Sequence, residues 1–175
     1  AYSGEADYVS RTLSAAATYA SESKNTTWNS SLAVSNDRIS PTVGAVRNAH
    51  KRVVNLAVGV TQVVSQHDLA QLLLTVMRGN GYFSDPYKVF DQRPRERNNQ
   101  TALLRWNHFH RFSSGTSRIS YRYYRDSFGI RAHTASVEYV QPLGSGWSVT
   151  PSMRLYTQNA ASFYVPVDPQ AAPFA

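Results

Sequence analysis

Apolar and polar residues alternate along most of the chain, and this period of two constrains its fold more than any other feature. In the stretch GWSVTPSMRLYTQ (146–158), every second residue from Trp147 to Leu155 is apolar, and the residues between them are polar or amphipathic. Successive side chains of a β-strand point to opposite faces of a sheet, so each such strand has one apolar and one polar face. The pattern predicts strands rather than helices.

The same alternation recurs in seven other segments, so we expect an all-β chain with eight strands. In 117–125, Ile119 and Tyr121 lie on one face, and Arg118 and Arg122 lie on the other. The remaining segments with this pattern are 5–21, 26–36, 49–65, 68–79, 99–112 and 130–142. These runs reach the ~9–11 residues that a tilted membrane-crossing strand needs, whereas a typical soluble strand has ~5–6.

The expected connections differ in length in a regular order. Short connections occupy 21–25, 65–68, 113–117 and 143–146, and long or medium connections occupy 36–48, 79–99 and 125–130. In an up-and-down sheet this order places tight turns at one end of the strands and long loops at the other, which is typical of outer-membrane barrels. We therefore predict an antiparallel up-and-down transmembrane β-barrel, with residues 1–175 as a single domain whose apolar face meets lipid.

The direction of the strands gives an expectation about the extent of the barrel. The first expected strand ends at a short turn, whereas a barrel with both termini in the periplasm begins on the short-turn side. We therefore expect about eight strands of a larger barrel, incomplete at both ends, with 159–175 as an external loop or tail.

Composition excludes some classes of protein and leaves others open. No run of ~20 apolar residues predicts a transmembrane helix, and the absence of cysteine excludes disulfides and thiol-metal sites. The net charge of +7 comes mainly from arginine, and the motif SYRYYRDS leaves a soluble nucleic-acid binder as an alternative. Such a platform needs aromatic and cationic side chains on one surface, and alternation separates them here, so we expect no nucleic-acid partner.

Charged residues on the polar faces of the later strands form an expected network on the lumen wall. It consists of Arg105, Arg111, Arg118, Arg122, Glu138 and Arg154. One interpretation is an anion-preferring constriction. The other is an ion-pair network that fills and stiffens the lumen, because buried charges must be paired.

The segment 79–99 is expected to be a long external loop. Within SDPYK (84–88), Pro86 and Asp85 favour a turn. The charged residues of this loop are Asp85, Asp91, Arg93, Arg95 and Arg97. Three functions are compatible with them: gating the lumen, binding lipopolysaccharide phosphates or an acidic partner through guanidinium groups, or pairing with one another to hold the loop rigid.

We predict neither a metal site nor a cofactor. The acidic residues on the long-loop side match no compact calcium-binding loop, and His108 and His110 have no further ligand nearby in the sequence. Asp126 and His133 flank one external loop, so an outer-membrane enzyme with a rim site is an alternative. Catalytic sets are recognised by geometry rather than composition, and we predict that the protein is not an enzyme.

Three blocks of sequence carry a resemblance to a known family. They are GY…DPYK…RP…R (81–97), YRYYRDSFGIRAHT (121–134) and PSMRLYTQNAASFY (151–164). Together they resemble the bacterial outer-membrane family catalogued as domain of unknown function 3570, with Phe128 where tryptophan is expected. The resemblance implies a barrel in the outer membrane of a Gram-negative bacterium and names no substrate. We expect a channel or transport pore, or a membrane scaffold in an envelope complex, with outer-membrane lipid, lipopolysaccharide and an envelope protein as partners.

Overall fold

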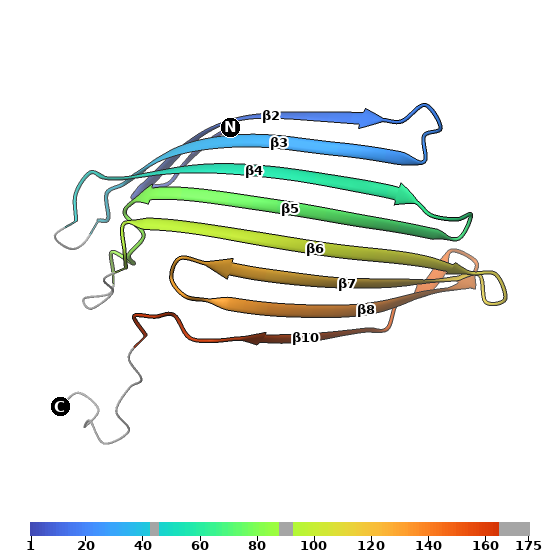
Figure 1. Cartoon of the computed structure of the whole chain (residues 1–175). Helices are drawn as coiled ribbons and strands as arrows, with labels where there is room; N and C mark the ends of the chain where they lie inside the picture. The colour runs from blue at the N-terminus through green and yellow to red at the C-terminus, as the bar shows by residue number, and fades with distance from the viewer. Residues whose placement is uncertain (43–45, 88–92, 165–175) are drawn as a thin grey trace, which may run out of the picture.

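The chain folds into one antiparallel sheet of ten strands, and a computed structural model describes residues 1–42, 46–87 and 93–164 (Figure 1). Within these ranges there is no helix, so none that is long and apolar enough to cross a membrane. The strands are β1 (Tyr2–Gly4), β2 (Tyr8–Ala20), β3 (Thr26–Ile39), β4 (Ala49–Val63), β5 (Asp68–Gly81), β6 (Glu96–His110), β7 (Gly115–Asp126), β8 (Arg131–Gly144), β9 (Trp147–Val149) and β10 (Ser152–Gln158). The prediction of an all-β, up-and-down antiparallel chain is confirmed.

The predicted number of eight strands is wrong at two places. A short strand, β1, precedes the first expected strand and pairs with its beginning. The last expected strand is divided into β9 and β10 around Pro151, which has no N–H to donate to a neighbouring strand. Pro151 still accepts a hydrogen bond through its carbonyl oxygen from the Tyr139 N–H, at 3.0 Å.

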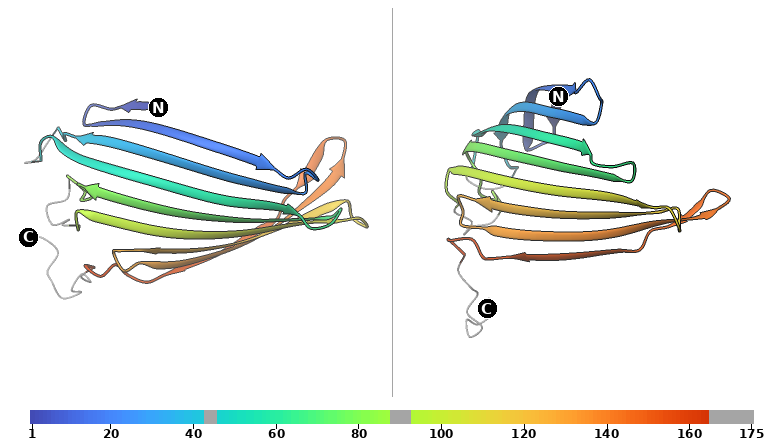
Figure 2. Two further views of the ribbon diagram at one scale, coloured as in Figure 1. Left: turned by 45° about the horizontal axis from the view of Figure 1, so that its top comes forward. Right: turned by 45° about the vertical axis from the view of Figure 1, so that its right-hand side comes forward.

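Each strand from β1 to β7 pairs with the next in the chain, β8 pairs with both β9 and β10, and the sheet is open. Its order is β1-β2-β3-β4-β5-β6-β7-β8-β10, with β9 also paired to β8. The two views of Figure 2 show a curved and twisted sheet, with the β8–β9 hairpin projecting at one end. In the described ranges β1 and β10 lie at opposite edges, so closure into a barrel is not observed.

The strand register gathers most of the large apolar residues on one face, whereas Leu69, Leu73, Met77, Leu103 and Phe109 lie on the other. One row across the sheet joins Trp28, Val60, Leu72, Leu104 and Tyr121 through successive cross-strand pairs. We call this side the apolar face and the opposite side the polar face. The larger apolar residues on the apolar face are Leu13, Tyr19, Trp28, Leu32, Leu56, Val58, Leu72, Leu74, Val76, Leu104, Trp106, Ile119, Tyr121, Val137, Met153 and Leu155.

The connections at the two ends of the strands differ, although less regularly than expected. The short-turn end has the connections 21–25, 64–67, 111–114 and 145–146, and the long-connection end has 5–7, 40–48, 82–95 and 127–130. The predicted loop 79–99 is therefore reduced to 82–95, and the predicted medium loop is a four-residue turn. The expected boundaries were wrong because β5 and β6 continue through residues that are polar on both faces, where alternation gives no signal.

The sheet is a single layer without an apolar core. Its accessible area is 12903 Å², about one and a half times the ~8,500 Å² expected for a compact protein of 19.5 kDa. Among the described residues, only Ile39, Val53, Phe128 and Ala132 are buried and apolar. Within residues 1–42, 46–87 and 93–164 no second layer covers the apolar face, so its side chains contact whatever medium surrounds the sheet.

Candidate functional site

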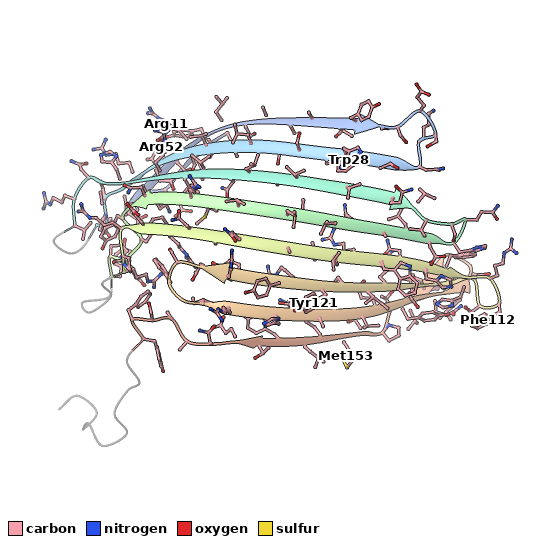
Figure 3. The ribbon with its side chains drawn as sticks, in the orientation of Figure 1. Arg11, Trp28, Arg52, Phe112, Tyr121 and Met153 are labelled. Carbon is pink, nitrogen blue, oxygen red and sulfur yellow. The ribbon has the colours of Figure 1, made fainter. Side chains whose placement is uncertain are left out.

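The apolar face is exposed along its whole width. Trp28, Leu104 and Met153, on three well-separated strands, have exposed fractions of 51%, 53% and 61%. Figure 3 shows Trp28, Tyr121 and Met153 on β3, β7 and β10. An apolar surface of this extent on a folded protein marks a contact with lipid or with another protein.

The short-turn end of the apolar face carries aromatic side chains with polar tips. The Trp106 Nε1–H donates to Asp68 Oδ1 at 3.0 Å, and His108 Nδ1 lies 2.7 Å from the same oxygen. The rings of His108 and His110 contact each other edge to face at 4.6 Å. In the described ranges no group of three or more His, Cys, Asp or Glu side chains could hold a metal ion. The contacts of these two histidines are ring contacts and hydrogen bonds to Asp68 and Ser117.

The polar face brings together most of the charged residues expected on a lumen wall. The register of β6, β7, β8 and β10 places five of them on this face: Arg105, Arg118, Arg122, Glu138 and Arg154. Arg111 does not join them. It lies in the turn 111–114 and is outside every strand.

Only part of this group is paired. An Arg118 guanidinium nitrogen lies 3.9 Å from Glu138 Oε2, and Arg105 donates to Gln71 Oε1 at 3.2 Å. In the part of the chain that the structure describes, no carboxylate lies within ion-pair distance of Arg122 or Arg154. The polar face therefore has an excess of positive charge.

A buried cluster around Asp126 lies at the long-connection end of the polar face. The Asp126 carboxylate is fully buried, and Arg97 lies 3.1 Å from its Oδ2. The Tyr124 hydroxyl donates to the same oxygen at 2.9 Å, and the Phe128 N–H donates to Oδ1 at 3.0 Å. The Phe128 ring covers the Arg97 guanidinium at 4.8 Å. The expectation that Arg97 belongs to an external loop is wrong, because it lies in β6 opposite Gly79.

A second cluster of the same kind forms around Asp37. The Tyr8 and Ser10 hydroxyls each donate to the Asp37 carboxylate at 2.7 Å, and Lys51 Nζ lies 3.2 Å from Asp37 Oδ2. The Lys51 ammonium also lies over the Phe83 ring, at 5.9 Å. Each cluster thus combines a buried carboxylate, a cation and a tyrosine, and neither cluster was predicted from the sequence.

Two phenylalanines connect the clusters. The ring of Phe83, which contacts Lys51, meets the ring of Phe128, which covers Arg97, edge to face at 6.5 Å. Gly79 makes room for this contact, since a Cβ atom at this position would lie 2.5 Å from the Phe83 ring. The long-connection end of the polar face is therefore covered by aromatic rings over paired charges.

The other predicted loop residues have local roles. Asp85 Oδ1 accepts a hydrogen bond from the Tyr87 N–H at 3.0 Å, which is the turn expected from SDPYK. The Arg93 N–H donates to Ser84 Oγ at 2.9 Å. The Arg95 carbonyl oxygen accepts a hydrogen bond from the Gly81 N–H at 2.8 Å. Asp91 lies outside the described residues.

Tyr87 fastens this connection to the start of the chain. Its hydroxyl donates to the Asp7 carboxylate in the turn between β1 and β2. This hydrogen bond raises the pKa of the Tyr87 phenol. The connection between β5 and β6 is thus joined directly to the turn between β1 and β2.

The residues considered for a catalytic site do not meet. Asp126 lies on the polar face, and its carboxylate is occupied by Arg97 and Tyr124. His133 lies on the apolar face, where its Nδ1 is 2.6 Å from the Tyr121 hydroxyl. The register between β7 and β8 places the side chains of Asp126 and His133 on opposite sides of the sheet.

Comparison with protein-family models gives one match. The model described as Protein of unknown function (DUF3570) matches residues 43–173. No curated protein and no solved structure matches the chain significantly.

Proposed function

The chain belongs to the family described as Protein of unknown function (DUF3570), and from this premise we propose that it forms the wall of a β-barrel in the outer membrane of a Gram-negative bacterium. The apolar face meets the hydrocarbon of the bilayer, and the polar face lines a lumen. Strands of 12 to 15 residues in the sheet from β2 to β8 suit a tilted crossing.

The observation that carries the proposal is the uncovered apolar face. In water its exposed leucines, tryptophans and tyrosines would drive aggregation, whereas a bilayer solvates them. Backbone groups also favour this assignment, since hydrogen-bonded strands satisfy the N–H and C=O groups that hydrocarbon cannot.

We further propose that the lumen conducts small anions. The polar face of β2 and β3 carries mainly small residues, among them Ser14, Thr18, Ser31 and Ser35, and such side chains leave space in a lumen. Arg122 and Arg154 face that space without a carboxylate in reach within the described ranges. A membrane scaffold in an envelope complex is the second candidate, and a closed lumen favours it.

Two adjacent leucines test the membrane assignment. Leu103 and Leu104 lie side by side in β6 and on opposite faces of the sheet. The chain has no cysteine, so Leu103→Cys and Leu104→Cys each introduce a single label site. In native membranes, an environment-sensitive fluorophore at 104 should report hydrocarbon, and one at 103 should report water and react with a hydrophilic thiol reagent. A water signal at both positions contradicts the proposal.

Single-channel recording tests conduction. The purified protein in planar bilayers should carry a current that prefers anions, and the double variant Arg122→Gln, Arg154→Gln should lose that preference because the unpaired charges are gone. Arg111→Gln, which changes a turn residue, should leave it unaltered. An unchanged selectivity in the double variant excludes the anion site, and no current at all favours the scaffold.

A further inference from the structure

Six arginines lie on the apolar face near the long-connection end, beyond the large apolar residues. We call these residues, each from a strand end, the arginine belt: Arg11, Arg38, Arg52, Arg78, Arg125 and Arg131. Figure 3 shows Arg11 and Arg52 together at that end of the sheet. All six side chains are exposed.

The belt lacks matching negative charge. In the described strands, Glu96 is the carboxylate on the same face at this end, and it makes no ion pair with the belt. Arg125 and Arg131 lie directly opposite each other across β7 and β8. Like charges in that position repel and destabilise a strand pair. An anion bound between the two guanidinium groups removes this repulsion.

A groove runs along the belt and is adjacent to apolar side chains. It has a volume of about 1430 Å³. Four belt arginines (Arg52, Arg78, Arg125 and Arg131) line it together with Glu96 and with Val54, Val76 and Tyr123, so positive charge exceeds negative charge there. A second groove of about 360 Å³ lies closer to the short-turn end of the same face, lined by Leu72, Leu104, Trp106, Ile119 and Tyr121. The apolar face thus offers cationic contacts near the long-connection end and apolar contacts between that end and the short-turn end.

The opposite end of this face is different. Between the turns 21–25 and 111–114 the apolar face carries Trp28, Trp106 and His108, and no arginine lies there among the described strand residues. A bilayer with two identical phospholipid leaflets would favour similar residues at the two ends of the apolar face. A cationic end and an aromatic end fit a bilayer whose two leaflets differ in anionic charge.

From these observations we propose that the arginine belt binds the phosphate groups of lipid A in the outer leaflet, with the acyl chains along the apolar face. The proposal rests on the proposed function, because it requires the apolar face to contact lipid. Guanidinium groups bind phosphate through paired, charge-assisted hydrogen bonds. The groove supplies four of them in a largely polar lining, with Val54, Val76 and Tyr123 beside them, so phosphate and an adjoining apolar chain can be bound together.

A charge-matched comparison of the two faces tests the proposal. The belt variant carries Arg52→Gln, Arg78→Gln, Arg125→Gln and Arg131→Gln. The control carries Arg105→Gln, Arg118→Gln, Arg122→Gln and Arg154→Gln on the polar face, with the same loss of charge. Binding of bisphosphorylated lipid A to the purified full-length protein in detergent is measured by native mass spectrometry and by thermal stabilisation. The belt variant should bind at least about tenfold more weakly, and the control should bind as the wild type does.

Each other outcome contradicts the proposal in a defined way. Equal binding by the belt variant excludes the belt as the site. Equal binding of dephosphorylated lipid A excludes phosphate as the recognised group, and competition by inorganic phosphate at the same concentration identifies a free anion as the ligand. If the quadruple variant does not fold, the pairs Arg52→Gln, Arg78→Gln and Arg125→Gln, Arg131→Gln give the same comparison. The labelling at Leu103 and Leu104 leaves every arginine intact, so it separates failure of this inference from failure of the membrane assignment.

Discussion

The charged pairs at the two ends of the polar face differ in burial. At the long-connection end, Asp126 is fully buried, its partner Arg97 lies 3.1 Å away, and Phe128 covers the pair. Toward the short-turn end, Arg118 and Glu138 are 3.9 Å apart and keep exposed side-chain fractions of 54% and 45%. The connections explain the difference, since they supply Phe83 and Phe128, which cover charges at one end, whereas the other end has only tight turns among the described residues.

This difference indicates where a lumen would be narrow. Charges that are desolvated need partners, and the long-connection end supplies them from several strands and connections. Charges that remain hydrated need none, so Arg122 and Arg154 are free to meet a solute. A conduit along the polar face would therefore be narrower at the long-connection end than at the other.

Breaking the buried pair should have the largest effect. Asp126→Asn removes the negative charge and leaves the Arg97 guanidinium without a counter-charge under Phe128. We expect a loss of about 3–5 kcal/mol in the free energy of unfolding, measured by urea titration of the protein folded in lipid vesicles. A loss below about 1 kcal/mol would mean that the pair is hydrated in the membrane.

The second cluster should be affected somewhat less. Asp37→Asn weakens the hydrogen bonds from Tyr8 and Ser10 and removes the ion pair with Lys51. The Asp126 carboxylate in addition accepts two backbone N–H groups, from Phe128 and Ile130, so more contacts depend on it. We expect a loss of about 2–3 kcal/mol in the same titration. Ser10→Ala, which removes one hydrogen bond and keeps the ion pair, is the control and should lose about 1 kcal/mol.

The aromatic link between the clusters gives a smaller effect. Gly79→Ala puts a Cβ atom 2.5 Å from the present position of the Phe83 ring, so the ring must move away from Phe128. We expect a loss of about 1–2 kcal/mol. In Gly59→Ala the nearest atom, Leu73 Cδ1, would lie 3.2 Å away, so this change should cost less. Equal losses in both variants would indicate a backbone effect unrelated to Phe83.

The open end should show the smallest effect. Arg118→Gln removes the half-exposed pair with Glu138, and such pairs contribute about 0.5 kcal/mol or less. The unfolding free energy should therefore change little. A loss near that of Asp126→Asn would remove the contrast between the two ends.

The faces of the sheet were predictable, whereas the clusters were not. Tyr121 and Arg122 are neighbours in the chain, and alternation alone assigns them to opposite faces. Asp126 and Arg97 are 29 positions apart in the sequence, and their contact depends on where β6 begins. Because ERNNQ is polar throughout, nothing local marks that beginning. Asp37 and Lys51 pair directly across β3 and β4, but only the observed register makes them opposite.

The sequence by itself determined the β-strand class, the up-and-down order and the residues that share the apolar face, because a period of two is a local property of the extended backbone. It missed β1 and the division of the last strand into β9 and β10. Only the tertiary structure decided which charges are buried, which form ion pairs and which gather in the arginine belt. These depend on register and on how the connections fold over the strand ends, and a shift of one residue in register reverses the face that each side chain occupies.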